Sequence, residues 1–300
     1  MKIHLFVILV LAILILTACN TGQIKTQRIA GYNFKSPDVT VIMPDVLHEV
    51  SGITFLDSTT LVCIQDEKGI LFFYDILRNE ISRQKEFYSN GDYEGIARIE
   101  DTIYVLRSDG VLYEIADFKS DNTIVTPFKT GIPSKDNEGL CYDGESGMLL
   151  IACKENTGKG DLSKDNRYIF GFDLTSKSMI MEPVFTFDID GLKEFAKTNN
   201  IDLPLKNSKR GLAVEADLKF RASGIAIHPF TGKLYLLSAE DHMLFFFDRT
   251  GSVQNMIRLN QVMFNQPEGI TFLENGDMFI SNEGFGKGPA TLLRFNYKSE

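Results

Sequence analysis

The sequence contains no tryptophan, and only four cysteines and four histidines occur among its 300 residues. The histidines are scattered, so neither a Ser-His-Asp triad nor the His and Cys spacing of a zinc site emerges. The chain also lacks a Walker motif and the glycine motif of dinucleotide-binding folds. These absences argue against a triad hydrolase, a zinc centre and a nucleotide-binding domain. The 23 phenylalanines instead predict a core filled by Phe rings.

Positive charge is scarce as well. The 31 Lys and Arg residues are outnumbered by 40 Asp and Glu residues, which gives a net charge of −9, and no block of basic residues interrupts this balance. Proteins bind nucleic acids largely through Lys and Arg contacts to phosphates. We therefore expect no nucleic-acid partner.

The cysteines do not suggest a disulfide framework. Apart from Cys19, the chain has Cys63, Cys141 and Cys153, and each of these lies inside an apolar run. An odd number of cysteines in such positions favours buried thiols. One bridge between Cys141 and Cys153 stays open as an alternative in an oxidising compartment.

The chain begins with a hydrophobic segment that reads MKIHLFVILVLAILILTAC. Its apolar run from Leu5 to Leu16 is shorter than the ~20 residues that a spanning helix needs. The ending Leu-Thr-Ala-Cys resembles the lipobox of bacterial lipoproteins, which are cleaved before the Cys and lipidated on it. The resemblance implies a signal peptide over 1–18, a lipid on Cys19 and a cell-envelope location, anchored to the inner or the outer bacterial membrane. An ordinary signal anchor is the alternative.

The remaining chain is predicted to be one domain. Residues 19–34 show no sustained periodicity and are expected to form a tether between the lipid and this domain. No later stretch with linker composition is long enough to separate two domains. We therefore predict a single domain over 35–300, present as a monomer.

One unit recurs five times in this domain, each time with a Glu-Gly or Ser-Gly step ahead of a strand-like run. The five anchoring glycines lie 43, 44, 85 and 45 residues apart, at Gly52, Gly95, Gly139, Gly224 and Gly269. A period near 44 is typical of a four-stranded propeller blade, which takes ~40–45 residues. Each unit also contains short β-branched and aromatic runs separated by turn residues. The sequence therefore predicts an all-β propeller.

The ends of the chain predict how the ring closes. The last unit stops after a third strand near Tyr297, whereas DVTVIM (38–43) precedes the first unit without a partner. If this N-terminal strand completes the last blade, both free edges disappear. The 85-residue gap is less regular, because 189–220 resembles a short helix and a loop. We predict five blades with an inserted excursion there, a candidate lid over one face, and keep six blades as the alternative.

The recurring acidic residues are expected to converge. In a propeller, the first strand of each blade lines the channel, and its start lies beside the end of the second strand. The predicted ligand or metal candidates at this opening are Glu49, Glu94, Glu138, Glu240, Glu268, Asn282 and Glu283. Crowded carboxylates resist simultaneous ionisation, which a cation such as Ca²⁺ would relieve. Arg107, Lys154 and Arg221 are the candidates for steadying an anion. The alternative role for each Glu is structural, capping N–H groups of its own strand.

The repeats resemble the SdiA-regulated family of bacterial envelope proteins, a phytase-like β-propeller group. The resemblance rests on LHEVSGITF, GDYEGIARI, DNEGLCYD, ASGIAIHPFTGKLYLLSAEDHMLFFFD and PEGITFLENGDMFISNEG, and it covers about 45–296. More distantly, the Glu-Gly steps are similar to those of gluconolactonase and senescence-marker propellers. That likeness implies that Glu94, Glu138 and Glu268 face a divalent metal, with Asn282 as an amide ligand. Ser51 and Ser223 depart from the pattern.

Two functions follow as hypotheses. The first is a cell-envelope lipoprotein whose acidic channel face binds a small molecule or an envelope protein, with or without a calcium ion. The alternative is a metal-dependent hydrolase, either a phytase-like phosphoesterase or a lactonase. Fold alone does not choose between them, because propellers host many functions. A phytase-like reaction would need a more basic rim than this acidic chain offers, which favours the binding protein.

Overall fold

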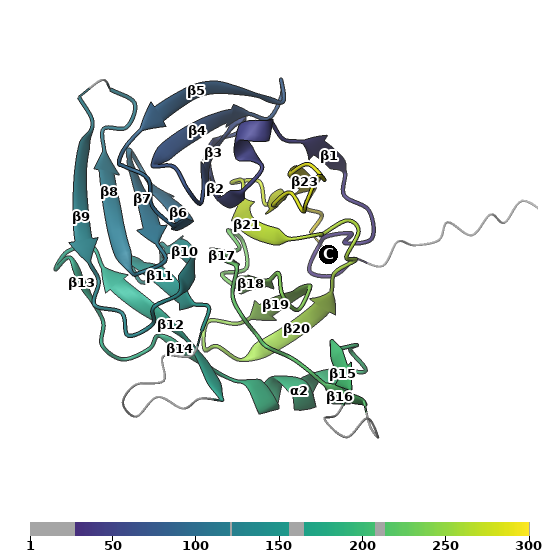
Figure 1. The fold of residues 1–300 in the computed structure, drawn as a ribbon. Helices are drawn as coiled ribbons and strands as arrows, with labels where there is room; N and C mark the ends of the chain where they lie inside the picture. The colour runs from purple at the N-terminus through teal and green to yellow at the C-terminus, as the bar shows by residue number, and fades with distance from the viewer. Residues whose placement is uncertain (1–27, 121, 156–164, 208–213, 300) are drawn as a thin grey trace, which may run out of the picture.

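The computed structural model describes residues 28–120, 122–155, 165–207 and 214–299. The predicted signal peptide, Cys19 and the first part of the predicted tether lie outside these residues. Within them, five antiparallel sheets are arranged around a central axis, as Figure 1 shows. The predicted five-bladed all-β propeller is confirmed. No helix in the described part of the chain is both long enough and apolar enough to cross a membrane.

The first four blades use strands that follow one another in the chain, with the first strand nearest the axis. The first blade contains β2 (Val50–Asp57), β3 (Thr60–Gln65), β4 (Ile70–Asp75) and β5 (Glu80–Glu86). The second contains β6 (Tyr93–Ile99), β7 (Thr102–Arg107), β8 (Val111–Ala116) and β9 (Ile124–Lys129). The third contains β10 (Asn137–Asp143), β11 (Met148–Cys153) and β12 (Asn166–Asp173), with β13 (Ser178–Met179) and β14 (Phe185–Asp188) both paired to β12.

The last two blades complete the ring. The fourth contains β17 (Gly224–Ile227), β18 (Leu234–Ser238), β19 (Met243–Phe247) and β20 (Val253–Arg258). The fifth contains β21 (Pro267–Phe272), β22 (Met278–Asn282), β23 (Thr291–Phe295) and, outermost, β1 (Val39–Ile42). β1 runs antiparallel to β23 with Val39 opposite Arg294 and Ile42 opposite Thr291. Strands from both ends of the chain therefore share one sheet.

The residues just before β1 also pack on the propeller. Tyr32 is fully buried, and its hydroxyl donates a 2.6 Å hydrogen bond to the carbonyl oxygen of Gly276. The ring of Phe34 contacts those of Phe246 and Phe295. The folded part therefore includes residues 28–34, although the sequence predicts a tether there. Apolar contacts anchor this stretch despite its lack of periodicity.

Five apolar clusters lie between the five pairs of neighbouring blades. Each blade packs on both of its faces, so a middle strand has no solvent-facing side. This explains the unbroken apolar run of β19, all of whose residues are buried. Phe rings supply much of this packing, for example Phe220 against Phe245 at 4.7 Å between ring centroids. Apolar contacts between the faces of neighbouring blades therefore fix the blades around the channel.

The irregular gap contains the excursion rather than a sixth blade. It comprises α2 (Ile189–Thr198), capped by the side chain of Asp188, and the hairpin of β15 (Leu205–Asn207) with β16 (Val214–Ala216). Among the described residues, the other helical element is the 3-10 turn η1 (Asp45–Leu47). α2 contacts β14 and β20, and Arg258 Nη1 donates to the carbonyl of Leu203 at 3.1 Å. Figure 1 places α2, β15 and β16 beyond the outer strand of the fourth blade, at the rim of the propeller and away from its central channel.

Candidate functional site

Four of the five inner strands carry a β-bulge at the residue before the repeated glycine. The register breaks between Val50 and Gly52, and the equivalent steps of β6, β10 and β21 break in the same way. The extra residues are Ser51, Glu94, Glu138 and Glu268. Bulges leave one residue out of the ladder and re-aim its side chain, and they are common beside functional sites. In the fourth blade Ser223 occupies this position, immediately before β17.

The glycines permit the inner strands to approach one another. A Cβ atom on Gly224 would lie 2.3 Å from the carbonyl oxygen of Glu268 in the next blade. A Cβ on Gly95 would lie 2.7 Å from the Cβ of Leu140. Both distances are too short for non-bonded atoms, so a residue without a side chain is required. Close packing at the axis therefore explains the glycines of these two steps, and that of Gly269, where a Cβ would lie 2.9 Å from Ile53.

The residue after each glycine closes the waist of the channel. These five side chains are aliphatic and at most 5% exposed, and they are Ile53, Ile96, Leu140, Ile225 and Ile270. The void bounded by them and by the bulged residues measures about 10 Å³. That volume holds roughly one water molecule. The channel is therefore divided into an acidic mouth on one side of the waist and a second pocket on the other.

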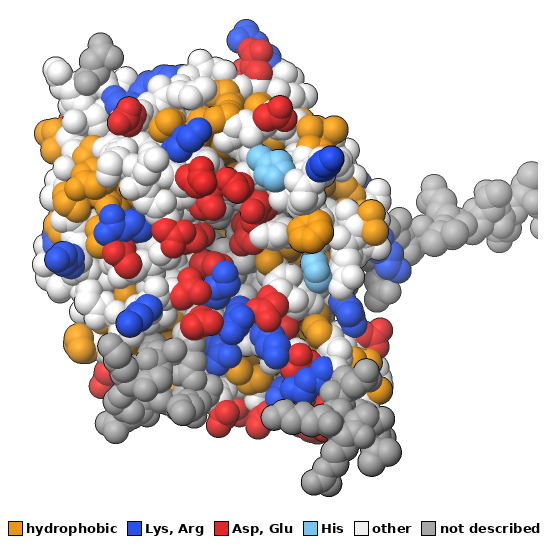
Figure 2. Space-filling model, viewed as in Figure 1, with side chains coloured by type: hydrophobic (Ala, Val, Ile, Leu, Met, Phe, Trp, Pro, Cys, Tyr) orange, Lys and Arg blue, Asp and Glu red, His pale blue; other side chains and the backbone are white. Residues whose placement is uncertain are grey.

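The acidic mouth contains a cavity of about 390 Å³. Figure 2 views this face and shows carboxylates gathered at its centre with Lys and Arg residues along one side. The cavity is lined by Glu138, Lys154, Arg221, Ser223, Ala239, Glu240, His242, Asn265, Gln266, Glu268 and Phe285. The structure thus brings together five of the predicted site residues in one cavity.

Glu138 is the most enclosed carboxylate of the mouth, at 5% exposure. Its Oε1 accepts a hydrogen bond from Nζ of Lys154, whereas its Oε2 is buried and has no hydrogen-bond partner among the described residues. Burial raises the pKa of Glu138 to about 7, and the ammonium of Lys154 limits the rise. An unpaired buried carboxylate oxygen is costly. A ligand that donates a hydrogen bond to this oxygen would therefore stabilise the site.

The two neighbouring glutamates hold their protons tightly. Burial, together with the charges of Glu138 and Asp92, raises the pKa of Glu94 to about 9. Burial and the charges of Glu138 and Glu283 raise the pKa of Glu268 well above its usual value. Carboxylates so close together disfavour simultaneous ionisation. A cation bound at the mouth would reverse this effect and release protons.

A second group of acids lies at the ends of the second strands. The backbone N–H of Asp66 donates to the carbonyl of Glu49, and that of Glu283 donates to the carbonyl of Gln266. Burial and the charge of Glu49 raise the pKa of Asp66 to about 6. Burial and the charges of Asp66 and Glu49 raise the pKa of Glu283. Glu49, Asp66 and Glu283 therefore extend the negative potential beyond the cavity.

Arg221 is already paired at the mouth. Its Nη1 donates to Glu240 at 2.7 Å and its Nη2 donates to Glu155 at 3.1 Å. Lys154 is likewise bound to Glu138. The two cationic candidates that line the cavity are therefore already bound to carboxylates. An anionic ligand would have to displace these carboxylates.

The structure does not bring Arg107 or Asn282 to the mouth. Arg107 donates to both carboxylate oxygens of Asp109, at 2.9 and 2.8 Å, and to the hydroxyl of Tyr113. The side-chain nitrogen of Asn282 donates to Thr291 at 3.0 Å and to the carbonyl of Met263. Arg107 pairs with Tyr93 and Asn282 with Pro267, so each lies one residue before the position that Lys154 occupies in its blade. A one-residue offset turns a strand side chain to the other face.

Several residues at the mouth were not among the predicted candidates. Asp66 ends the second strand of the first blade, and its signal is an acidic residue at the position equivalent to Lys154 and Glu283. Asn265 and Gln266 precede the last Glu-Gly step, whereas His242 and Phe285 come from loops that carry no repeated motif. Loop residues of this kind reach the cavity through tertiary folding and give no periodic signal.

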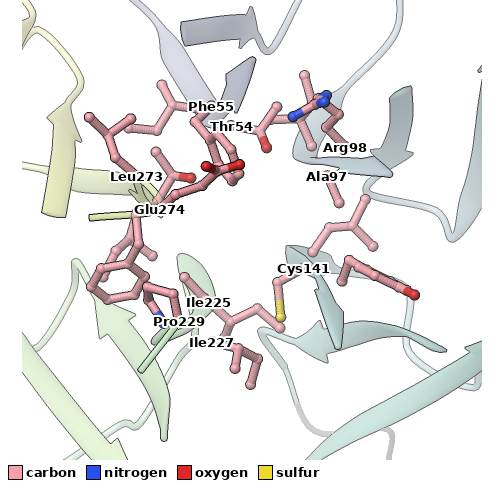
Figure 3. A pocket seen from close by; sticks show the side chains of 18 residues that line it. Thr54, Phe55, Ala97, Arg98, Cys141, Ile225, Ile227, Pro229, Leu273 and Glu274 are labelled. Carbon is pink, nitrogen blue, oxygen red and sulfur yellow. The ribbon is translucent and has the colours of Figure 1, made fainter. Parts of the chain in front are cut away.

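The pocket beyond the waist is chemically different. It measures about 220 Å³ and lies among apolar side chains that include Phe55 and Leu273. Figure 3 shows Arg98 and Glu274 among its lining side chains, with the sulfur of Cys141 in its wall. The two ends of the channel therefore offer opposite surroundings to a ligand.

The three cysteines of the propeller are free thiols. Cys63, Cys141 and Cys153 are all buried and unbridged. The prediction of buried thiols is confirmed, and the alternative bridge between Cys141 and Cys153 is not formed. Burial raises the pKa of each thiol, so these cysteines act as apolar packing groups.

The described side chains do not form a ready-made Ca²⁺ site. Within residues 28–120, 122–155, 165–207 and 214–299, no three His, Cys, Asp or Glu side chains are placed to hold one metal ion. Ca²⁺ takes six to eight oxygen ligands. At Glu138, one oxygen is bound by the ammonium of Lys154. The mouth therefore carries the negative charge that a metal ion needs. Its described carboxylates, however, are not grouped closely enough to bind one ion together.

The comparisons with known proteins agree with this fold. The SdiA-regulated family model matches residues 183–286. The resemblance to the SdiA-regulated family, which the repeats predicted, is therefore confirmed over this segment. It spans the fourth blade and the two inner strands of the fifth, including Ser223, Glu240 and Glu268. No curated protein matches the chain in sequence.

Solved structures show the same fold at low sequence identity. The glutaminyl cyclase of Myxococcus xanthus has a TM-score of 0.55 and 13% identity, with 88% of this chain and 97% of that chain covered. The PQQ-bound aldose sugar dehydrogenase of Streptomyces coelicolor has a TM-score of 0.50 and 12% identity, with 88% and 100% covered. Such identities establish a shared propeller fold and leave function to be argued from the site.

Proposed function

We propose that the protein is a cell-envelope lipoprotein of the SdiA-regulated type that binds a cationic ligand, or a cationic group of an envelope protein, at its acidic mouth. The observation that carries this proposal is Glu138, which is almost fully buried and keeps one carboxylate oxygen without a hydrogen-bond partner among the described residues. A cation placed there would satisfy this oxygen and relieve the repulsion among Glu94, Glu138 and Glu268.

The contacts of the cationic residues favour binding over hydrolysis. A phosphoesterase acts on an anionic substrate, which free basic groups would help to hold. Lys154 and Arg221 are instead engaged by Glu138, Glu240 and Glu155. Arg107 is bound to Asp109. The hydrolase alternative therefore has less support from the described residues than the binding protein.

The proposal is tested by thermal unfolding of the purified full-length protein, kept in mild detergent, with calcium chloride or n-butylammonium chloride. A ligand that binds the folded state raises the melting temperature, and the rise grows with its concentration relative to Kd. We expect at least one cation to raise it, and Glu138→Gln to abolish the rise. If neither cation shifts the melting temperature, the acidic mouth is not a cation-binding site and the proposal fails.

The envelope location has its own test, because it rests on the lipobox resemblance at Cys19. Wild-type protein expressed in bacteria is expected to fractionate with membranes and to incorporate a labelled fatty acid. Cys19→Ser should lose the label and move to the soluble fraction. Incorporation of label into Cys19→Ser would refute lipidation at this residue.

A further inference from the structure

We propose that the acidic mouth recognises an organic cation that carries N–H donors, namely a primary ammonium group, in preference to a metal ion. This inference rests on the proposed function and specifies the chemistry of its ligand. It is carried by the charges of the cavity, by its unpaired acceptors and by one ammonium that the chain itself places there.

Among the charged side chains that line the cavity, one carboxylate has no cationic partner. Lys154 is paired with Glu138, and Arg221 is paired with Glu240 at the mouth. Glu268 has no Lys, Arg or His partner within salt-bridge distance among the residues that the structure describes. Burial raises the pKa of Glu268 and keeps a proton on it, and a monovalent cation beside it would take the place of that proton without changing the net charge.

The other polar groups around Glu268 leave acceptors facing the ligand. Asn265 Nδ2 donates to the carbonyl of Glu283 at 2.7 Å, and Gln266 Nε2 donates to the carboxylate of Glu283. One N–H of each amide is thereby used, and the amide oxygens accept no hydrogen bond that the structure records in the cavity. Oε2 of Glu138 adds a buried acceptor without a donor among the described residues. A ligand that brings several N–H groups would satisfy these atoms through charge-assisted hydrogen bonds.

Lys154 shows how the mouth accommodates an ammonium. Its Nζ donates directly to the buried carboxylate of Glu138. Compact ammonium groups bind through a few directed N–H bonds, whereas Ca²⁺ needs a shell of six to eight oxygens. The side-chain arrangement at Glu138 therefore suits the first kind of cation better than the second.

Phe285 offers a surface for the rest of such a ligand. It lines the cavity and is 74% exposed, so its ring is open to a ligand at the mouth. An aromatic face attracts a nearby ammonium, and its carbon surface can pack against an alkyl chain. The ligand class is therefore an alkyl or aralkyl primary amine, protonated at neutral pH.

The test is isothermal titration calorimetry of the full-length protein in mild detergent with three probes: n-butylammonium, tetramethylammonium and Ca²⁺. Tetramethylammonium has the same charge as n-butylammonium but no N–H donor. We expect n-butylammonium to bind at least about tenfold more tightly than tetramethylammonium, the ratio expected for one lost charge-assisted hydrogen bond. Glu268→Gln should weaken n-butylammonium binding by a similar factor. Glu274→Gln, an exposed acid at the other end of the channel, is the matched control and should leave binding unchanged.

The outcomes separate this inference from the proposed function. If Ca²⁺ binds in a Glu138-dependent way and n-butylammonium does not, the mouth is a metal site, and the preference for an ammonium is wrong while the proposed function stands. Equal affinities for n-butylammonium and tetramethylammonium would refute recognition through N–H donors. If none of the three cations binds, both proposals fail. Circular dichroism melts of each variant establish that a loss of binding is not a loss of folding.

Discussion

The hydroxyl of Ser51 donates a 2.6 Å hydrogen bond to the carbonyl oxygen of Tyr93, the residue before Glu94 in the next blade. Ser223 makes the same 2.6 Å bond to Pro267, the residue before Glu268. Each serine therefore ties its inner strand to the neighbouring one and fixes the backbone next to a channel carboxylate. This role explains why two of the five repeats have Ser in place of Glu.

Removing either hydroxyl is expected to destabilise the propeller. Ser51→Ala and Ser223→Ala should each lower the free energy of unfolding by about 1 kcal/mol, the typical contribution of one intramolecular hydrogen bond. Urea denaturation followed by circular dichroism measures this change. Ser58→Ala, at an exposed turn position, is the control and should unfold at the wild-type midpoint. Unchanged midpoints for both buried serines would contradict a linking role.

Glu94 should make the protein less stable in alkali. Burial raises its pKa from the usual 4.5 to about 9, so between these values the folded state binds more protons than the unfolded state. Stability therefore falls as pH rises through this range. Glu94→Gln cannot titrate and should flatten the decline, with a higher melting temperature than wild type at pH 9. Glu80→Gln, at an exposed site, should keep the wild-type slope; an equally flat profile there would disprove the assignment to Glu94.

The pair of Lys154 and Glu138 predicts a characteristic double-mutant result. Lys154→Met leaves the buried carboxylate of Glu138 without its cation, while Lys154 itself is 35% exposed. The expected cost at neutral pH is on the order of 2 kcal/mol, less than for a fully buried pair because solvent screens part of the charge. Adding Glu138→Gln removes the stranded charge and should restore most of the loss. Additive effects of the two changes, measured by urea unfolding, would show that the groups do not interact.

His228 should make stability fall in acid. Its Nδ1 accepts N–H bonds from Phe230 and Thr231 at 3.1 and 3.2 Å, so a proton on this nitrogen would face two donors. Burial lowers its pKa from 6.5 to about 4, and between these values the unfolded state binds more protons. Stability should therefore decrease as pH falls from 6.5 to 4 and lose this dependence below pH 4.

His228→Asn keeps an acceptor at this position but does not titrate. The variant is expected to show a smaller change of urea midpoint between pH 6.5 and 4 than wild type. His48→Asn provides the comparison for a histidine outside the aromatic core. If both variants retain the wild-type pH dependence, another group is responsible for it.

The sequence predicted the blades because the repeat is visible residue by residue. The Glu-Gly and Ser-Gly steps mark the inner strands, and their spacing indicates five units with one irregular gap. The convergence of Glu138, Glu240 and Glu268 on one cavity followed from the antiparallel pairing of first and second strands. These features depend on local pattern and on propeller topology alone.

The misplacement of Arg107 and Asn282 has a different origin. The hairpin between the first and second strands differs in length from blade to blade, since Tyr93 pairs with Arg107, Asn137 with Cys153 and Pro267 with Asn282. Ser108, rather than Arg107, is the residue whose N–H bonds the carbonyl of Asp92, as Lys154 bonds that of Asp136. The sequence contains no local signal for this offset. Tyr32 was missed for a related reason, since its burial depends on partners more than 200 residues away.

The position before each repeated glycine can accept different residues. It stands outside the regular ladder, so its side chain can change while the pairing on either side keeps its register. Glu and Ser already alternate there without altering the blades. The three Glu positions of the mouth are therefore free of the linking role that Ser51 and Ser223 have, and related chains with other side chains at these three positions are expected to bind other ligands on the same blades.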